Sequence, residues 1–103
     1  MKPTTKSAGG TSFHDTTFKA TPNQLMELLG KPHNYYNNGS DKVNIDWVLE
    51  TETGDVFTVY DWKYYRSLDM DTVYEWHIGG KSRDITEIAL QEIQEKLKSK
   101  VQI

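Results

Sequence analysis

The chain has no cysteine among its 103 residues. Disulfide bridges, thiolate metal sites and thiol nucleophiles are therefore excluded, and a reducing compartment is expected. An excess of positive charge is also missing, since 12 Lys and Arg stand against 15 Asp and Glu, for a net charge of −3. Proteins that bind nucleic acid through charge are normally clearly basic. A nucleic-acid partner is therefore not expected.

Long apolar runs are absent as well. No stretch approaches the roughly 20 apolar residues of a transmembrane helix, and residues 1–10, MKPTTKSAGG, lack the apolar segment of a secretion signal. We therefore expect a soluble cytoplasmic protein with no membrane partner. The small polar residues at 1–10 bury too little surface to offset the entropy of ordering. They are predicted to form a flexible arm, followed by a single domain over residues 11–103.

Aromatic residues are plentiful, at 12% of a chain whose hydrophobic fraction is only 36%. One small core is expected to depend on a few large side chains, each of which buries about 150–250 Å². Two of the three tryptophans, Trp62 and Trp76, lie within residues 55–81, the stretch around which the chain is organised. We assign Trp47 and Trp76 to the core.

Apolar and polar residues alternate over 43–50, 56–62 and 72–78, which predicts three strands. A short or edge strand is predicted over 16–20, and an apolar stripe predicts a helix over 85–97.

A second, shorter helix is predicted from its ends, because Thr21 and Pro22 are typical of a helix start and Gly30 of a helix end. Asp84 and Glu87 have the spacing of a capping box for the longer helix. The order β-α-β-β-β-α predicts an α+β fold, in which two helices pack on one face of an antiparallel sheet of three to four strands. The other face of that sheet is left free.

A candidate anion site lies between the last predicted strand and the last helix. Backbone N–H groups of Gly79 and Gly80 and the positive end of the helix dipole favour an anion there, and Lys81 and Arg83 add charge. The P-loop motif is excluded, because its first glycine would fall at Glu75. The alternative is that the two glycines only form the turn into the helix and the cations lie on the surface.

A second candidate site consists of aromatic residues beside a cation. Tyr60, Trp62 and His77 with Lys63 are suited to stacking on a base or another planar ring. His14 is open to two interpretations, a residue in a turn or one that faces a ligand.

Catalytic patterns are not found. The three histidines are not accompanied by a nucleophile elbow. A metal site drawn from His14, Asp15, Asp46 and His77 has no supporting spacing. We assign no catalytic residue, metal or cofactor.

Four segments resemble a family of small proteins carried by tailed phages and some large DNA viruses. They are GTSF at 10–13, DKVNIDWVLE at 41–50, VFTVYDWKYYR at 56–66 and EWHIGGK at 75–81. YDWK and WHIGG are the most specific of these motifs. The resemblance implies a viral origin and a shared fold, and it implies no established activity. The helix ending in LLGKP ahead of a Trp-bearing strand is also similar to β-lactamase-inhibitor-like and outer-membrane-assembly lipoprotein modules.

Two functional hypotheses follow. The first is a non-catalytic phage protein that holds a small phosphate-bearing ligand such as a nucleotide, and thereby counters host defence in the host cytoplasm. Gly79, Gly80, Lys81 and Arg83 would hold the anion while Trp62 or Tyr60 stacks on the ring. The second is a module that inhibits a host protein through its exposed sheet face and its Tyr-rich loops at 35–36 and 64–65. A homo-oligomer is compatible with both.

Overall fold

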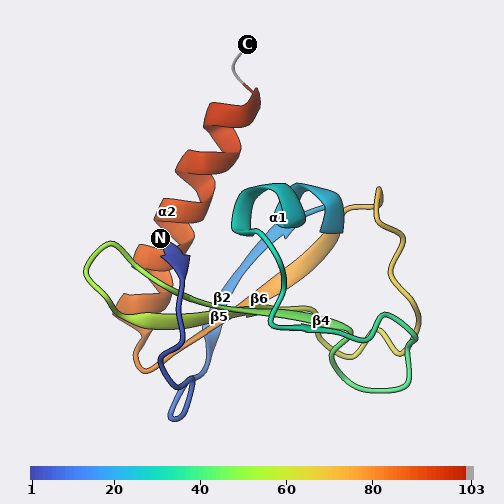
Figure 1. Cartoon of the computed structure of the whole chain (residues 1–103), viewed down its shortest axis with the longest axis horizontal. Helices are drawn as coiled ribbons and strands as arrows, with labels where there is room; N and C mark the ends of the chain where they lie inside the picture. Colours follow the sequence, from blue (N-terminus) through green and yellow to red (C-terminus); the bar gives the residue numbers. More distant parts are fainter. Residues whose placement is uncertain (102–103) are drawn as a thin grey trace.

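The computed structural model describes residues 1–101, and only the backbone of Lys100 and Val101. Two helices lie on one side of an antiparallel sheet, which Figure 1 shows almost edge-on. The elements, in chain order, are β1 (Lys2–Pro3), β2 (Ser12–Ala20), α1 (Pro22–Leu29), β3 (Asn34–Tyr35), β4 (Ile45–Glu50), β5 (Val56–Tyr60), β6 (Tyr74–Gly80) and α2 (Arg83–Val101).

The α+β class and the antiparallel sheet are confirmed, but the strand count differs from the prediction. The sheet has six strands, in the order β1-β4-β5-β6-β2, with β3 also paired to β4. The two additional strands, β1 and β3, have two residues each. Pairs this short leave no periodic pattern in a sequence, which explains why the predicted order lacked them.

One sheet face and both helices enclose the core. Residues 45, 47 and 49 of β4 are buried there, and their neighbours across the ladder place Phe57, Val59 and Ile78 on the same face. Leu25 and Leu29 of α1 and Ala89 and Ile93 of α2 complete one continuous cluster. We call the opposite surface of the sheet, which faces away from α1 and α2, the open face.

Two buried tryptophans fix the position of α1. The rings of Trp47 and Trp76 meet edge to face at 5.6 Å between centroids, and each is at most 1% exposed. The indole N–H of Trp76 donates to the carbonyl of Ala20 and that of Trp47 to the carbonyl of Gly30, both at 2.9 Å. These carbonyls flank α1 at its two ends. The two tryptophans therefore lie in the core, as predicted, and also anchor this helix.

The helix ends differ in how well the sequence predicted them. α1 begins as expected, with Thr21 capping it and exchanging hydrogen bonds with Gln24. α2 begins two residues earlier than predicted, because the Ser82 hydroxyl accepts a hydrogen bond from the N–H of Ile85 and so acts as the cap. The predicted capping box at Asp84 is therefore wrong.

Residues 1–10, predicted to be a flexible arm, are placed against the sheet instead. β1 pairs with β4 at one edge and β2 with β6 at the other, so residues 4–11 connect opposite edges. Four interstrand steps span about 19 Å, within the roughly 26 Å that eight extended residues reach.

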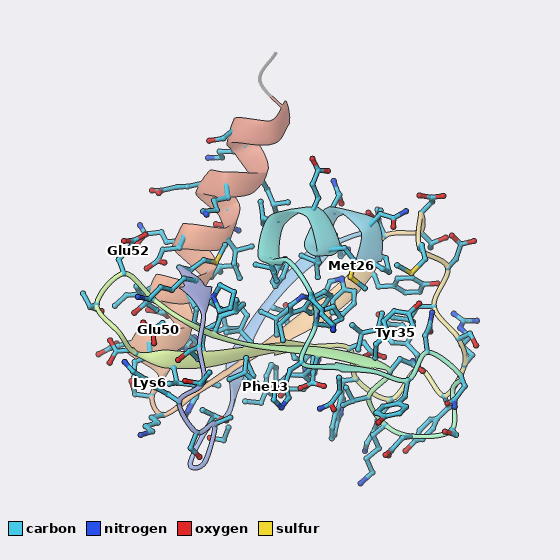
Figure 2. All side chains as sticks on the ribbon, viewed as in Figure 1. Lys6, Phe13, Met26, Tyr35, Glu50 and Glu52 are labelled. Carbon is cyan, nitrogen blue, oxygen red and sulfur yellow. The ribbon has the colours of Figure 1, made fainter. Side chains whose placement is uncertain are left out.

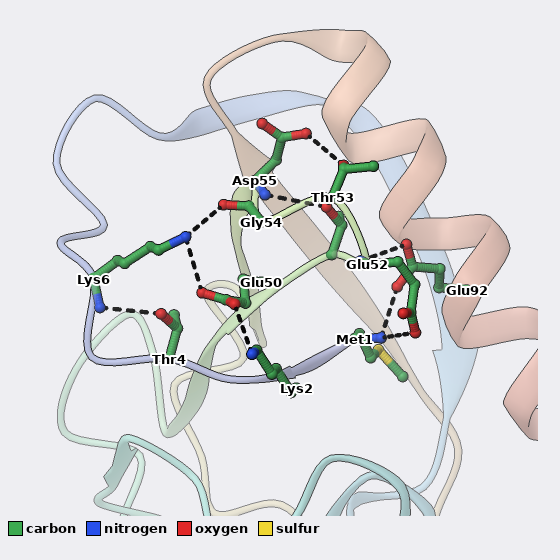
Figure 3. A network of polar contacts seen from close by, with 11 residues as sticks. Met1, Lys2, Thr4, Lys6, Glu50, Glu52, Thr53, Gly54, Asp55 and Glu92 are labelled. Carbon is green, nitrogen blue, oxygen red and sulfur yellow. Dashed lines mark hydrogen bonds and ion pairs between the residues drawn. The ribbon is translucent and has the colours of Figure 1, made fainter.

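Charged side chains hold this N-terminal segment, as Figure 3 shows. The ammonium groups of Lys2 and Lys6 lie 3.4 and 3.2 Å from the carboxylate of Glu50, and Lys6 also donates to the carbonyl of Gly54. A hydrogen bond from Thr4, and then Lys6 and Lys2, hold the pKa of Glu50 below its ordinary value. The segment thereby occupies the end of the open face near Glu50.

A buried polar network joins the loops at the other end of the sheet. Asp61 is fully buried and accepts hydrogen bonds from the backbone N–H groups of Asn44 and Ile45 and from the side-chain amide of Asn44, at 2.8 to 2.9 Å. The same Asn44 amide donates to the carbonyl of Arg66, and its side-chain oxygen accepts from Gly39. Residues 39–45 and 61–66 are thus held together by two side chains.

No helix within residues 1–101 is both long and apolar enough to cross a membrane.

Replacing Asp61 tests this network. Asp61→Ala leaves buried N–H donors of Asn44 and Ile45 without an acceptor, so we expect the free energy of unfolding to fall by about 3 kcal/mol or more. Urea denaturation measures the change. The matched control is Asp15→Asn at an exposed position, for which we expect a change within about 0.5 kcal/mol. Equal stability of Asp61→Ala and the wild type would contradict the role given to this carboxylate.

Candidate functional site

Four aromatic side chains gather on the open face, and we call them the ring cluster. They are Phe13 from β2, Tyr60 from β5, His77 from β6, and Trp62, which follows β5. Figure 2 shows Phe13 on the side of the sheet opposite both helices. Tyr60 and His77 are direct neighbours across the β5–β6 ladder. The sheet therefore brings together residues that lie up to 64 positions apart in the chain.

His77 lies at the centre of the ring cluster. Its ring stacks on Phe13 with 4.2 Å between centroids and an interplanar angle of 17°. The ring centroid of Trp62 lies 6.3 Å from that of His77, at an interplanar angle of 29°. Tyr60 meets both rings edge to face, with centroid distances of 5.5 Å to His77 and 6.0 Å to Trp62. Phe13 and Trp62 each remain 40% exposed. The cluster is thus internally packed and still presents two large rings to solvent.

Gly79 provides room beneath the cluster. A Cβ atom at this position would lie 2.5 Å from the hydroxyl oxygen of Thr58 and 3.6 Å from the ring of Tyr60. Only glycine leaves the space that these two side chains occupy. Gly79 is therefore part of the candidate site through its missing side chain, and its backbone is paired in the sheet with Thr58 on one side and Phe13 on the other.

Two lysines flank the exposed tryptophan. The ammonium groups of Lys63 and Lys42 lie 5.5 and 6.0 Å from the centroid of the Trp62 ring, within the range of cation–π attraction. The N–H of Lys63 donates to the carbonyl of Lys42 at 2.7 Å, which ties the two loops together.

Strained backbone borders the ring cluster. Lys63 and Tyr65 next to Trp62, and Asp15 in the bulge of β2 next to Phe13, all have left-handed backbones, with φ of 56°, 53° and 65°. Such residues cost about 1–3 kcal/mol each and are concentrated at functional sites.

Burial shifts the proton affinity of the cluster. It lowers the pKa of His77 from its ordinary 6.5, against an opposing effect of the nearby Glu75 carboxylate. It also raises the pKa of Tyr60. Both shifts favour the neutral rings, which suits a surface for apolar or stacking contacts.

The predicted anion site is divided between two surroundings. Gly80, predicted to lie in the turn, belongs to β6 and pairs with Phe57 and Ser12, so its backbone is committed to the sheet. Lys81 is exposed at the end of β6. The Arg83 side chain lies 3.3 Å from the carboxylate of Glu87 in an i,i+4 pair. Both glycines therefore lie in a strand, and not in the turn before α2 where the sequence placed them.

His14 has a structural partner. Its Nε2 lies 3.0 Å from the carbonyl oxygen of Gly80, to which it donates, and 3.3 Å from the hydroxyl of Ser12. The contact spans the bulge between β2 and β6. Three of the four tyrosines in the two predicted loops, Tyr35, Tyr36 and Tyr65, are open to solvent. The fourth, Tyr64, is partly buried, and its hydroxyl accepts a hydrogen bond from the N–H of Glu75.

No group of three or more His, Asp or Glu side chains suited to a metal ion is found in the described part of the chain.

The sequence indicated Tyr60, Trp62, Lys63, His77 and Gly79 but missed Phe13 and Lys42. Phe13 lies an odd number of residues before the buried Phe18, and alternation along one strand places such residues on opposite faces of the sheet. That signal was available. Lys42 lies in a loop and carries no periodic signal, and only its backbone bond to Lys63 brings it to Trp62.

Acidification tests the state of His77. Because its folded pKa is below 6.5, the unfolded chain binds more protons, and stability falls as the pH drops through this range. We expect the free energy of unfolding to decrease between about pH 7.5 and 5.5, and to decrease less in His77→Phe. Urea denaturation across this range measures both slopes. Above about pH 7.5 the difference between the two proteins should be constant; identical slopes throughout would contradict the assignment.

Comparisons of the chain with models of protein families, with curated proteins and with solved structures found no match.

Proposed function

We propose that this protein is a non-catalytic binding module that holds a partner protein against its open face. The ring cluster is the observation that carries this proposal, because it exposes stacked aromatic side chains on the sheet surface that neither helix covers. Aromatic residues are enriched at the energetic centres of protein interfaces.

The surroundings of the cluster favour a protein over a polyanion. Residues 19 and 75 pair across β2 and β6 on the open face and carry opposite charges, as Lys19 and Glu75. Asp46 lies beside Tyr60, and Lys63 lies beside Trp62. An apolar centre with a rim of mixed sign is typical of protein interfaces. We therefore propose a partner with an apolar patch bordered by charges of both signs.

The surface is also preorganised. Three of its four rings are carried by paired strands, and each ring is held by at least one other. Binding to such a surface immobilises few additional side chains, which reduces the entropic cost of association.

Hollows elsewhere on the surface do not include the cluster. One is lined by residues 2–6 and Glu50, and another by Asp84, Glu87, Ile88 and Gln91 of α2.

On the basis of the resemblance to phage proteins, we propose a host protein as the partner and the host cytoplasm as the location.

Alanine variants of the two exposed rings test the function. The double variant Phe13→Ala, Trp62→Ala is expected to keep its fold, because both side chains are 40% exposed, and to bind the partner at least about 30-fold more weakly. Ile88→Ala is the matched control, since Ile88 is 42% exposed on α2. Affinity capture from host extract with all three proteins, quantified by mass spectrometry, measures the effect.

A protein retained by the wild type and by Ile88→Ala but lost by the double variant is the expected result. Equal recovery by all three would exclude the open face. A wild-type dimer that dissociates in the double variant, seen by sedimentation velocity, would assign the face to a second copy of the chain.

A small phosphate-bearing ligand is the second function that we propose for this face. Trp62 offers an exposed ring for stacking, and Lys42 and Lys63 lie beside it. In this proposal Lys42 and Lys63 supply the positive charge for the phosphate, a role that the sequence analysis gave to Lys81 and Arg83. Stacking of a base on such a ring contributes about 1–3 kcal/mol.

Thermal unfolding with linear and cyclic nucleotides tests this second function. A nucleotide at about ten times its Kd would stabilise the folded state by about 1.4 kcal/mol, which raises the Tm of a domain of this size by about 5 °C or more. The shift should disappear in Trp62→Ala and with the nucleoside that lacks phosphate. Equal shifts in the wild type and Trp62→Ala would place the nucleotide elsewhere.

A further inference from the structure

The corner of the open face at Trp62 differs from the rest of the ring cluster. It carries two positive charges, Lys42 and Lys63, within 6.0 Å of the ring centroid. No ion pair joins either ammonium group to a carboxylate in the part of the chain that the structure describes. Both lysines are exposed.

Specific backbone and buried contacts bring the two lysines together, whereas an ordinary surface charge needs no such contacts. Lys63 has a left-handed backbone with φ of 56°, and its N–H bonds the carbonyl of Lys42 at 2.7 Å. The buried Asp61 carboxylate next to Trp62 accepts from Asn44, two residues after Lys42. The same network therefore positions the ring and both of its cationic neighbours.

We propose that Trp62, Lys42 and Lys63 form an oxyanion subsite. It binds a carboxylate or phosphate group of a molecule in which that group lies beside an apolar or planar group. The oxyanion lies between the two ammonium groups, and the adjoining apolar part packs on the indole ring. The inference rests on the proposed function, because it names the chemistry of the group that docks at one corner of the open face.

The three tryptophans make the subsite directly observable. Trp47 and Trp76 are 1% and 0% exposed, whereas Trp62 is 40% exposed, so an aqueous quencher of fluorescence reaches Trp62 selectively. Iodide is an anion, so a positive potential at this ring increases its quenching. Caesium is a cation, so the same potential decreases its quenching. The readout needs no identified partner.

We expect iodide to quench the wild type about threefold more efficiently than the double variant Lys42→Gln, Lys63→Asn, at about 0.1 M ionic strength. Asparagine is chosen at position 63 because it tolerates a left-handed backbone. The matched control is Lys81→Gln, Lys98→Gln, which removes the same charge from two exposed positions. This control should behave like the wild type, and caesium should show the reverse order.

Inorganic phosphate and acetate, added at matched ionic strength, distinguish the two sources of the oxyanion. Protection from iodide by phosphate alone assigns the subsite to a phosphate group, and protection by acetate assigns it to a carboxylate. Equal iodide quenching in the wild type and the Lys42, Lys63 variant would overturn the subsite. If capture by the open face still depended on Phe13 and Trp62, the proposed function would stand without it.

Discussion

The hydrogen bonds of the Asp61 carboxylate are the interaction on which the uncovered end of the sheet depends. The carboxylate is fully buried, and it accepts hydrogen bonds from three N–H groups of Asn44 and Ile45. A buried carboxylate is stable only when such donors satisfy it, so the start of β4 and the end of β5 must lie together. Asn44 extends the network to Gly39 and Arg66, and Gly39 is required because a Cβ atom there would lie 2.5 Å from the Arg66 backbone. The irregular segments beside Trp62 are thus ordered by buried polar groups as well as by apolar packing.

The tryptophans illustrate how one residue type serves two purposes in a small domain. Trp47 and Trp76 fill the core, and their indole N–H groups anchor both ends of α1. Trp62 lies just beyond the end of β5 and remains 40% exposed. Exposure of a side chain this large forgoes a stabilising burial of about 1.5–3 kcal/mol or more. The left-handed backbones of Lys63 and Tyr65 lie at the same corner, so two costs in stability coincide there.

The open face is divided between two uses. Near Glu50 it is occupied by the N-terminal segment, whose lysines pair with that carboxylate. Near Tyr60 and His77 it is uncovered and aromatic. This division follows from topology, because β1 and β2 lie at opposite edges of the sheet and the chain between them must pass across one end. The other end, which carries the ring cluster, is left uncovered.

The sequence by itself determined the α+β class, the antiparallel ladder of the longer strands, the start of α1 and the burial of Trp47 and Trp76. Periodicity and capping are local signals, and these features depend on residues close in the chain. Only the tertiary structure decided the pairing of β1, the inclusion of Gly79 and Gly80 in β6, and the meeting of Phe13 with His77. Lys42 and Trp62 likewise become neighbours through the backbone bond between Lys63 and Lys42 and through the buried contacts of Asp61 with Asn44. Such contacts join residues far apart in sequence, and their energy lies in desolvated hydrogen bonds and ring packing, which no local pattern encodes.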